Sequence, residues 1–240
     1  MYSTFLKSEV KKWTRDPMLF FMLFYPLLFG ALGRYLLPWL AEGGDFNVDL
    51  YADIVLVVLA LMIPVIFGAV LAFSILDDRD DHILTSIKVT PLSLNQFLSF
   101  RVALVFAVSF ASCTFVMWFA DIGGLTISNI AAISFLASLS APMSGLVINA
   151  FSNNKIEGFA VMKGLGTVML FPVIALFFID YKEFFFAVVP GFWPAKAISS
   201  IVRGEGLLLL TYNQYYFIGL AYAVVVNLLA YKLFLKRTRV

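Results

Sequence analysis

The sequence predicts an all-α membrane protein with six transmembrane helices, and three observations lead to this prediction. Hydrophobic residues make up 62% of the 240 residues and charged residues only 13%, whereas soluble domains carry about 25% charged residues. Six mostly apolar runs each approach the roughly 20 residues that a helix needs to cross a bilayer. The short alternating segments of a membrane barrel do not occur, so each run is expected to be a helix. A soluble enzyme is thereby excluded.

The spans and their orientation follow from hydropathy and from the positions of lysine and arginine, which accumulate on the cytoplasmic side. With the N-terminus inside, 13 of the 17 lysines and arginines lie on inner segments or adjoining helix ends, against Arg34, Lys182, Lys196 and Arg203 outside. Both termini of this multi-pass chain, a single transmembrane domain over residues 1–240, are therefore expected in the cytoplasm. The expected spans are Met18–Leu40, Asp53–Leu76, Leu98–Ala120, Thr126–Ala150, Phe159–Ile179 and Tyr215–Leu235.

Residues 1–16 predict an amphipathic helix that lies in the inner membrane interface. Apolar and aromatic residues recur at helical spacing on one face, including Phe5 and Trp13, whereas Lys11 and Lys12 fall largely elsewhere. Such a helix buries its apolar face at the headgroup boundary and brings lysines near anionic lipids. Membrane lipids are therefore expected partners. The alternative is a polar leader whose lysines only fix the topology.

The loop between the second and third spans, residues 77–95, carries five consecutive charged residues and then a short amphipathic stretch that a Thr-Pro pair ends. A helix of this kind can dock its apolar face into a groove on another protein while its charges fix the register. The alternative is a solvated loop with a helical turn. The residues expected to contact the partner are Asp77, Asp78, Arg79, Asp80, Asp81, His82, Leu84, Ile87, Thr90 and Pro91.

This loop gives the chain a resemblance to the ABC type-2 transporter permeases, the membrane subunits of many bacterial exporters. Members often carry Glu-Arg-Glu-x-Gly-Thr-Leu after the second span, followed by an apolar pair and Thr-Pro. Here Asp78-Arg79-Asp80 stands for the charged triplet and Thr90-Pro91 for the Thr-Pro, whereas His82-Ile83 replaces the Gly-Thr and Ile87-Lys88 the apolar pair. The interfacial helix, the six spans and the proline-rich external segment also match, so the resemblance covers nearly the whole chain.

The resemblance implies that residues 77–95 form the coupling helix that contacts a separate ABC ATPase subunit in a bacterial plasma membrane. No Gly-x-x-x-x-Gly-Lys-Ser/Thr occurs in the sequence, so this chain has no P-loop for ATP phosphates. It is expected to be no enzyme and to hold no cofactor or metal, with ATP and Mg on the partner ATPase. Pairing with a second copy or a paralogue through the first and fifth spans is also implied. A net charge of +2 gives no reason to expect nucleic acid.

The external segment, residues 180–212, is aromatic and broken by prolines and glycines, and its apolar pieces are too short to span. Such pieces at membrane depth are usually re-entrant or interfacial and buried against protein. The resemblance implies a re-entrant helical hairpin that caps the outer mouth of the pathway, with Pro190, Trp193 and Pro194 as the external gate. The alternative is an interfacial loop without a gating role.

Charges lie near the ends of the spans. Arg34, Arg101 and Lys163 are expected to extend their charged groups to the interface, and no buried acid pair or proton relay is visible. The leading hypothesis is the permease subunit of an ATP-driven exporter of amphipathic or lipophilic substrates. One alternative is an ion-coupled secondary transporter, which would need an ion site or an inverted repeat. The other is a non-transporting membrane scaffold or sensor subunit.

Small residues and prolines inside the spans predict packing details. Gly164 with Gly166, and Ser144 with Gly145, are expected to let helices pack closely, and Asn227 to make an interhelical hydrogen bond. Proline removes a backbone hydrogen bond and kinks a helix. Kinks are expected at Pro26, Pro38, Pro64, Pro142 and Pro172.

Overall fold

The computed structural model describes residues 2–42, 51–81, 94–204 and 206–238, and every regular element in these ranges is a helix. Six helical segments in them are long and apolar enough to cross a membrane: Pro17–Glu42, Ala52–Asp80, Asn95–Ala120, Ile127–Phe151, Lys155–Ala175 and Tyr212–Arg237. Each overlaps one predicted span, so the all-α fold class with six spans is confirmed.

Several spans are built from more than one helix, and three of the helices that the structure describes lie outside the spans. The elements in chain order are α1 (Tyr2–Arg15), α2 (Pro17–Met22), α3 (Tyr25–Ala31), the π-helical turn η1 (Leu32–Leu36), α4 (Leu37–Glu42), α5 (Ala52–Asp80), α7 (Leu94–Ala120), α8 (Ile127–Ser138), α9 (Ser140–Phe151), α10 (Lys155–Val168), α11 (Leu170–Ala175), the 3-10 helix η2 (Tyr181–Phe186), α12 (Phe192–Val202) and α13 (Tyr212–Thr238). Of these, α1, η2 and α12 are not parts of spans.

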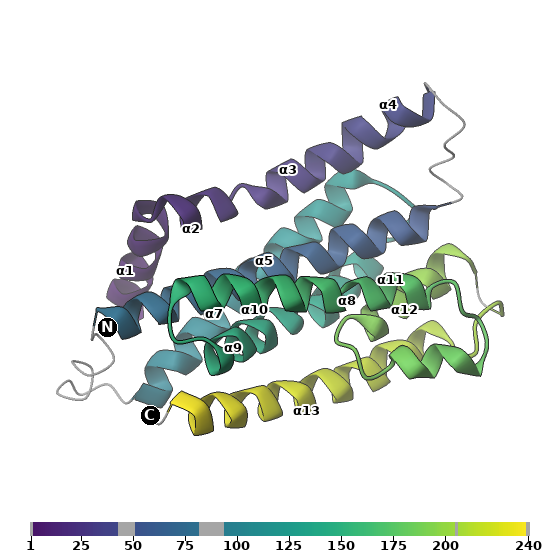
Figure 1. Cartoon of the computed structure of the whole chain (residues 1–240). Coiled ribbons are helices and arrows are strands. Elements are labelled where there is room, and N and C mark those ends of the chain that lie inside the picture. The colour runs from purple at the N-terminus through teal and green to yellow at the C-terminus, as the bar shows by residue number, and fades with distance from the viewer. Residues whose placement is uncertain (1, 43–50, 82–93, 205, 239–240) are drawn as a thin grey trace.

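The second span, α5, is the central helix of the bundle. It packs against α7, α9, α10 and α12. In its most apolar stretch 78% of the residues are buried, compared with 17% in the corresponding stretch of α13. In Figure 1 the long helices lie side by side, and α1 crosses the end of the bundle at which the chain also terminates. The helices η2 and α12 lie at the opposite end. Following the orientation expected from the lysine and arginine positions, we call these the inner and the outer end.

Two glycines bring α5 and α9 into backbone contact. A Cβ on Gly68 would lie 2.8 Å from the carbonyl oxygen of Ala141, and a Cβ on Gly145 would lie 2.8 Å from the carbonyl oxygen of Gly68. The close packing predicted for Ser144 and Gly145 is therefore confirmed. A Cβ on Gly164 or Gly166 would meet no atom within 4 Å, so among the residues that the structure describes no other helix packs closely at these two glycines.

Prolines set most of the helix breaks inside the spans. The turns at Leu23, Leu139 and Met169 each precede a proline by three residues, because proline lacks an N–H and its ring clashes with the carbonyl four residues earlier. The kinks predicted at Pro26, Pro142 and Pro172 are thus confirmed. Pro38 lies just after the π-helical turn, whereas α5 continues through Pro64 as an unbroken α-helix.

Candidate functional site

A buried arginine at the inner end joins three helices. The Arg101 guanidinium, on α7, donates to Glu9 Oε1 of α1 from Nε at 3.0 Å and from Nη2 at 2.5 Å. Its Nη1 forms an ion pair with Asp78 Oδ2 of α5. Side chains of all three residues are at most 4% exposed. The expectation that Arg101 reaches for the interface is therefore wrong, because its charge is neutralised inside the protein.

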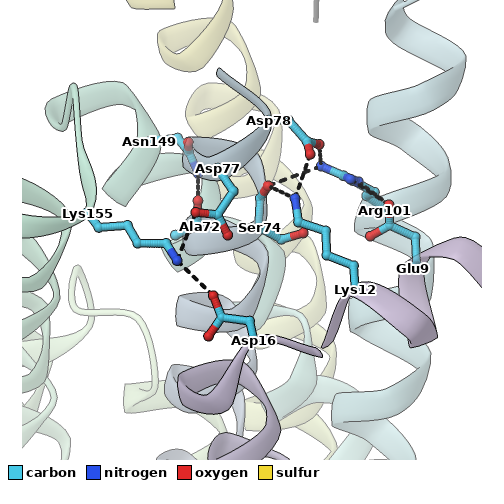
Figure 2. Close-up of polar contacts among 10 residues, drawn as sticks. All are labelled: Glu9, Lys12, Asp16, Ala72, Ser74, Asp77, Asp78, Arg101, Asn149 and Lys155. Carbon is cyan, nitrogen blue, oxygen red and sulfur yellow. Dashed lines mark hydrogen bonds and ion pairs between the residues drawn. The ribbon is translucent and has the colours of Figure 1, made fainter. Parts of the chain in front are cut away.

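Lys12 of α1 completes this inner network, which consists of Glu9, Lys12, Asp78 and Arg101. Its ammonium donates to Asp78 Oδ1 at 2.5 Å and to the carbonyl oxygen of Ser74 at 2.6 Å. Figure 2 shows Asp78 between the two cations, with Glu9 on the far side of Arg101. Two carboxylates and two cations give no net charge, which removes much of the penalty for burying charged groups.

The inner network ties together the two helices that flank the predicted coupling segment. Asp78 lies in the last turn of α5, and Arg101 lies near the start of α7. Their ion pair closes the base of the loop, and α1 covers that pair with Glu9 and Lys12. These contacts join α1, α5 and α7 at one point.

A second set of ion pairs joins α1 and α2 to α10. The Lys155 ammonium lies 2.8 Å from Asp16 Oδ2 and 2.8 Å from Asp77 Oδ1. Asp16 also caps α2, because its Oδ1 accepts hydrogen bonds from the backbone amides of Met18 and Leu19. Burial raises the pKa of Asp16, but the bonds from Lys155, Leu19 and Met18 outweigh it and hold that pKa below its ordinary value.

The lowered pKa of Asp16 predicts a pH-dependent contribution to stability. The Asp16–Lys155 pair stabilises the fold above the ordinary carboxyl pKa of about 3.9 and is lost as the pH falls through the lower folded-state value. We expect Asp16→Asn, which keeps a capping oxygen, to lower the thermal unfolding midpoint of the solubilised protein at pH 6, and this deficit to shrink as the pH falls below the ordinary carboxyl pKa. Asp16→Ala also loses the cap, worth about 1 kcal/mol, at every pH. Identical profiles for the two variants would contradict this assignment.

The acidic run divides into an inward and an outward part. Asp77 and Asp78 form the ion pairs described above, and Arg79 Nη1 donates to the carbonyl oxygen of Ser152 at 3.0 Å. Asp80 and Asp81 are exposed. Of the residues predicted to contact a partner, Asp78 is buried and paired within the chain, so its carboxylate is not on the surface. His82, Leu84, Ile87, Thr90 and Pro91 lie outside the described residues.

The N-terminal helix presents a different face to the bundle from the one expected. Trp13 is 4% exposed and belongs to the core, and Lys12 points to Asp78 rather than outward. Placing these two residues on the lipid-contacting surface is therefore wrong. Glu9, Lys12 and Trp13 are spaced three or four residues apart, so they share the face of α1 that packs against the protein. Lys11 is exposed, as are Leu6 and Val10. Phe5 lies in α1, and its side chain is outside the described part of the structure.

The outer end contains a buried acid–base cluster that the sequence reading missed. Glu183, Lys196 and Tyr215 are all 0% exposed. The Lys196 ammonium lies 2.6 Å from Glu183 Oε2 and donates to the carbonyl oxygen of Phe178 at 2.5 Å. The Tyr215 hydroxyl donates to Glu183 Oε1 at 2.5 Å. The available signal for this pair was the opposite charge of Glu183 and Lys196, 13 positions apart, with Lys196 isolated among apolar residues.

A second outer ion pair connects α12 to α5. Asp53 Oδ2 lies 2.6 Å from Arg203 Nη2 and accepts hydrogen bonds from Arg203 Nε at 2.7 Å and Ser199 Oγ at 3.1 Å. Arg203 Nη1 also donates to the carbonyl oxygen of Leu176, at the end of α11. These residues were not predicted as a site, because 150 positions separate Asp53 from Arg203 in the sequence.

The predicted gate residues share one small cavity. Pro190, Trp193 and Pro194 line a space of about 20 Å³ together with the α8–α9 break at Leu139 and with Asn227 of α13. That volume suffices for one water molecule. Trp193 and Pro194 are buried rather than placed at a lipid interface, and Trp193 Nε1 donates to the carbonyl oxygen of Ala187. The predicted gate residues are therefore packed against α8, α9 and α13 with little space between them.

Asn227 also borders a larger apolar groove. Its Nδ2 donates to the carbonyl oxygen of Leu139 at 2.9 Å, which confirms the predicted interhelical hydrogen bond. The groove has a volume of about 410 Å³ and is formed by α7, α9 and α13, with Ser99, Asn227 and Tyr231 as its polar groups. A space of this size and character suits a mainly apolar ligand with a few hydrogen-bonding groups.

Comparison with known proteins identifies the family. The family described as "Fluoroquinolones export permease protein Rv2686c-like" matches residues 9–231. The chain belongs to this permease family. Two similar relatives are the fluoroquinolones export permease proteins MT2760 and Rv2686c of Mycobacterium tuberculosis, strains CDC 1551 / Oshkosh and ATCC 25618 / H37Rv. Each is 31% identical to this permease over 207 residues, which cover 81% of this chain and 80% of the relative.

The matched part of the permease extends from α1 to α13 and contains the whole inner network. The resemblance to exporter permeases predicted from the sequence is confirmed. The chain is a membrane permease of the kind found in exporters, a transport subunit rather than an enzyme, and a multi-pass membrane protein.

Proposed function

We propose that this chain is the permease subunit of an ATP-driven ABC exporter and that a separate ATPase subunit docks at its inner end. Both termini and the loop between α5 and α7 then lie in the cytoplasm, where 13 of the 17 lysines and arginines are placed. ATP and Mg act on the partner. The chain itself provides half of the translocation pathway.

The observation that carries this proposal is the arrangement of the acidic run at the inner end of α5. Asp80 and Asp81 are exposed and available to a partner, while Asp77 and Asp78, just before them, hold α10, α7 and α1. A partner that pushes on the exposed part therefore acts on the central helix and on three of its neighbours. Such a rigid connection is what coupling a distant ATPase to a membrane pathway requires.

Pairing with a second copy or a paralogue is supported by the apolar surfaces of the first and fifth spans. Phe21 and Trp39 are more than 60% exposed in the first span, and Phe177 is 68% exposed just after α11. Gly164 and Gly166 leave α10 open to close approach by another helix. Lipid also covers such surfaces, but the pathway needs a second half, which these faces are suited to contact.

The names of the relatives suggest a substrate class. Both are named as fluoroquinolones export permeases, and fluoroquinolones are planar, amphipathic and partly charged. We infer that this permease moves molecules of that type. The largely apolar groove of about 410 Å³ beside Asn227 fits an aromatic ligand with a few polar groups.

Transport into inverted membrane vesicles tests this function. We expect vesicles that contain the permease and its ATPase subunit to accumulate a fluorescent fluoroquinolone only when ATP is supplied. Uptake driven by a proton gradient without the ATPase would instead support an ion-coupled carrier. Absence of flux from a complex that still hydrolyses ATP would support the scaffold or sensor function.

The docking role predicts a specific loss on charge reversal. Asp80→Lys, and Leu84→Asp in the segment that follows, should abolish co-purification with the ATPase or ATP-dependent uptake, because each inverts the character of the predicted contact surface. Membrane insertion should survive, since Asp80 is exposed. Lys182→Glu, which reverses a charge that is 69% exposed at the outer end, is the matched control and should behave as wild type. Normal co-purification and uptake in Asp80→Lys would refute the docking role.

A further inference from the structure

Polar contacts fasten the middle and the C-terminal end of α12 to the chain segment that precedes it. Near its middle, Lys196 binds Glu183 of η2 and the carbonyl oxygen of Phe178. At its C-terminal end, Arg203 binds the carbonyl oxygen of Leu176, which follows α11. We call the segment 176–203, which follows the fifth span, the external hairpin. Separating a fully buried Lys–Glu pair leaves an unpaired charge in an apolar interior, so the hairpin is expected to move as one body.

The hairpin contacts two spans in different ways. On the α13 side, Tyr215 and Glu183 are fully buried, and a Cβ on Gly219 would lie 2.6 Å from Trp193 Cβ. On the α5 side, the polar link is the pair Asp53–Arg203, supported by Ser199. The polar link to α13 is thus fully buried, whereas the polar link to α5 includes the partly exposed Arg203.

Water can reach the α5 link. The Arg203 side chain is 28% exposed, although its partner Asp53 is only 3% exposed. When this pair separates, Arg203 exchanges the carboxylate for water at its exposed side. Asp53 lies in the first turn of α5, where the helix dipole stabilises a negative charge. Both charges thus retain stabilisation after separation, unlike those of the Glu183–Lys196 pair.

We propose that Asp53 and Arg203 form an outer lock that holds the external hairpin against α5, and that the outer mouth opens when the hairpin pivots on α13 and this pair separates. This inference rests on the proposed function, because it assigns the opening step to a transport pathway. Asp53 and Arg203 are positioning residues: they set the closed position of the hairpin and need not touch the transported molecule.

Cysteine labelling tests the outer lock without transport. The single cysteine, Cys113, is fully buried and can be replaced by alanine. Leu61 of α5 lies under the start of α12, since a Cβ on Gly191 would lie 3.1 Å from Leu61 Cδ1, and is 2% exposed. A cysteine at position 61 in the full-length permease in liposomes reports hairpin opening through its reaction with a membrane-impermeant maleimide.

We expect Asp53→Asn to raise the labelling rate roughly ten-fold, because a charge-assisted contact is lost while the side-chain shape is kept. Arg203→Lys, which keeps a charge but loses the forked contact, should give an intermediate rate. Lys182→Ala is the matched control, because its pair with Asp180 is exposed on the same hairpin; its rate should equal that of the unmodified sequence.

Two outcomes would overturn the outer lock. The first is an unchanged rate in both Asp53→Asn and Arg203→Lys. The second is an increase in Tyr215→Phe, which removes the hydrogen bond to Glu183, that exceeds the increase in Asp53→Asn, because the hairpin would then open from α13. Since the assay uses neither ATPase nor substrate, its failure leaves the proposed function standing, and a failure of ATP-dependent uptake leaves the labelling result standing.

Discussion

Replacing Arg101 by methionine is expected to destabilise the permease by about 3–5 kcal/mol, the cost of removing one partner from a buried ion network. The substitution leaves Glu9 and Asp78 buried, with Lys12 as the remaining cation in the inner network. The loss should appear as a lower thermal unfolding midpoint of the solubilised protein. The unfolding midpoint of Arg101→Lys should lie between those of the unmodified protein and Arg101→Met, because one ammonium cannot reproduce the fork that contacts both carboxylates.

A second substitution separates this electrostatic cause from lost packing. Glu9→Gln added to Arg101→Met leaves Asp78 and Lys12 as a balanced pair, so the double variant should recover part of the stability. Strictly additive losses would contradict the network. Arg34→Met is the control, since its ion pair with Asp121 is exposed, with side chains 45% and 71% accessible; such pairs contribute little.

Gly68→Ala is expected to prevent α5 and α9 from packing and to abolish recovery of folded protein. The added methyl would lie 2.0 Å from Ser144 Oγ and 2.8 Å from the Ala141 carbonyl oxygen. Ser144 cannot turn away freely, because its hydroxyl is bonded to its own helix at Ser140. Overpacking commonly costs about 1–3 kcal/mol, and the cost here should exceed that range because backbone must move. The yield of monodisperse protein measures the effect.

Gly166→Ala provides the matched control for Gly68→Ala. A methyl at position 166 meets no atom within 4 Å, and alanine favours a helix over glycine by about 1 kcal/mol. The chain should therefore fold with unchanged or slightly higher stability. Equal yields for the two variants would show that the α5–α9 contact is looser than described.

Hydropathy sufficed to predict the six spans and most of their ends. The third span was expected at Leu98–Ala120 and extends to Leu94, and the second was expected to end at Leu76 but continues to Asp80. That additional turn escaped prediction because its residues are charged. In the structure those charges are paired within the protein, which allows a helix to continue beyond its apolar part.

The candidate sites were less accessible to prediction, because they depend on contacts between distant segments. The acidic run was predicted to contact a partner, but nothing in its local sequence separates buried Asp78 from exposed Asp80. The distinction arises from α1 and α7, which bring Lys12 and Arg101 to the same place. Likewise, an isolated lysine at position 196 looks like an interfacial charge until Glu183 is found beside it.

The unequal burial of the spans affects which amino-acid replacements each span of this permease can accept. A helix enclosed on all sides, as α5 is, tolerates only replacements that preserve shape, whereas α13 presents most of its surface to whatever surrounds the bundle. Selection can therefore retune the outer helices for a new lipid composition or a new neighbour while the enclosed helix stays nearly constant.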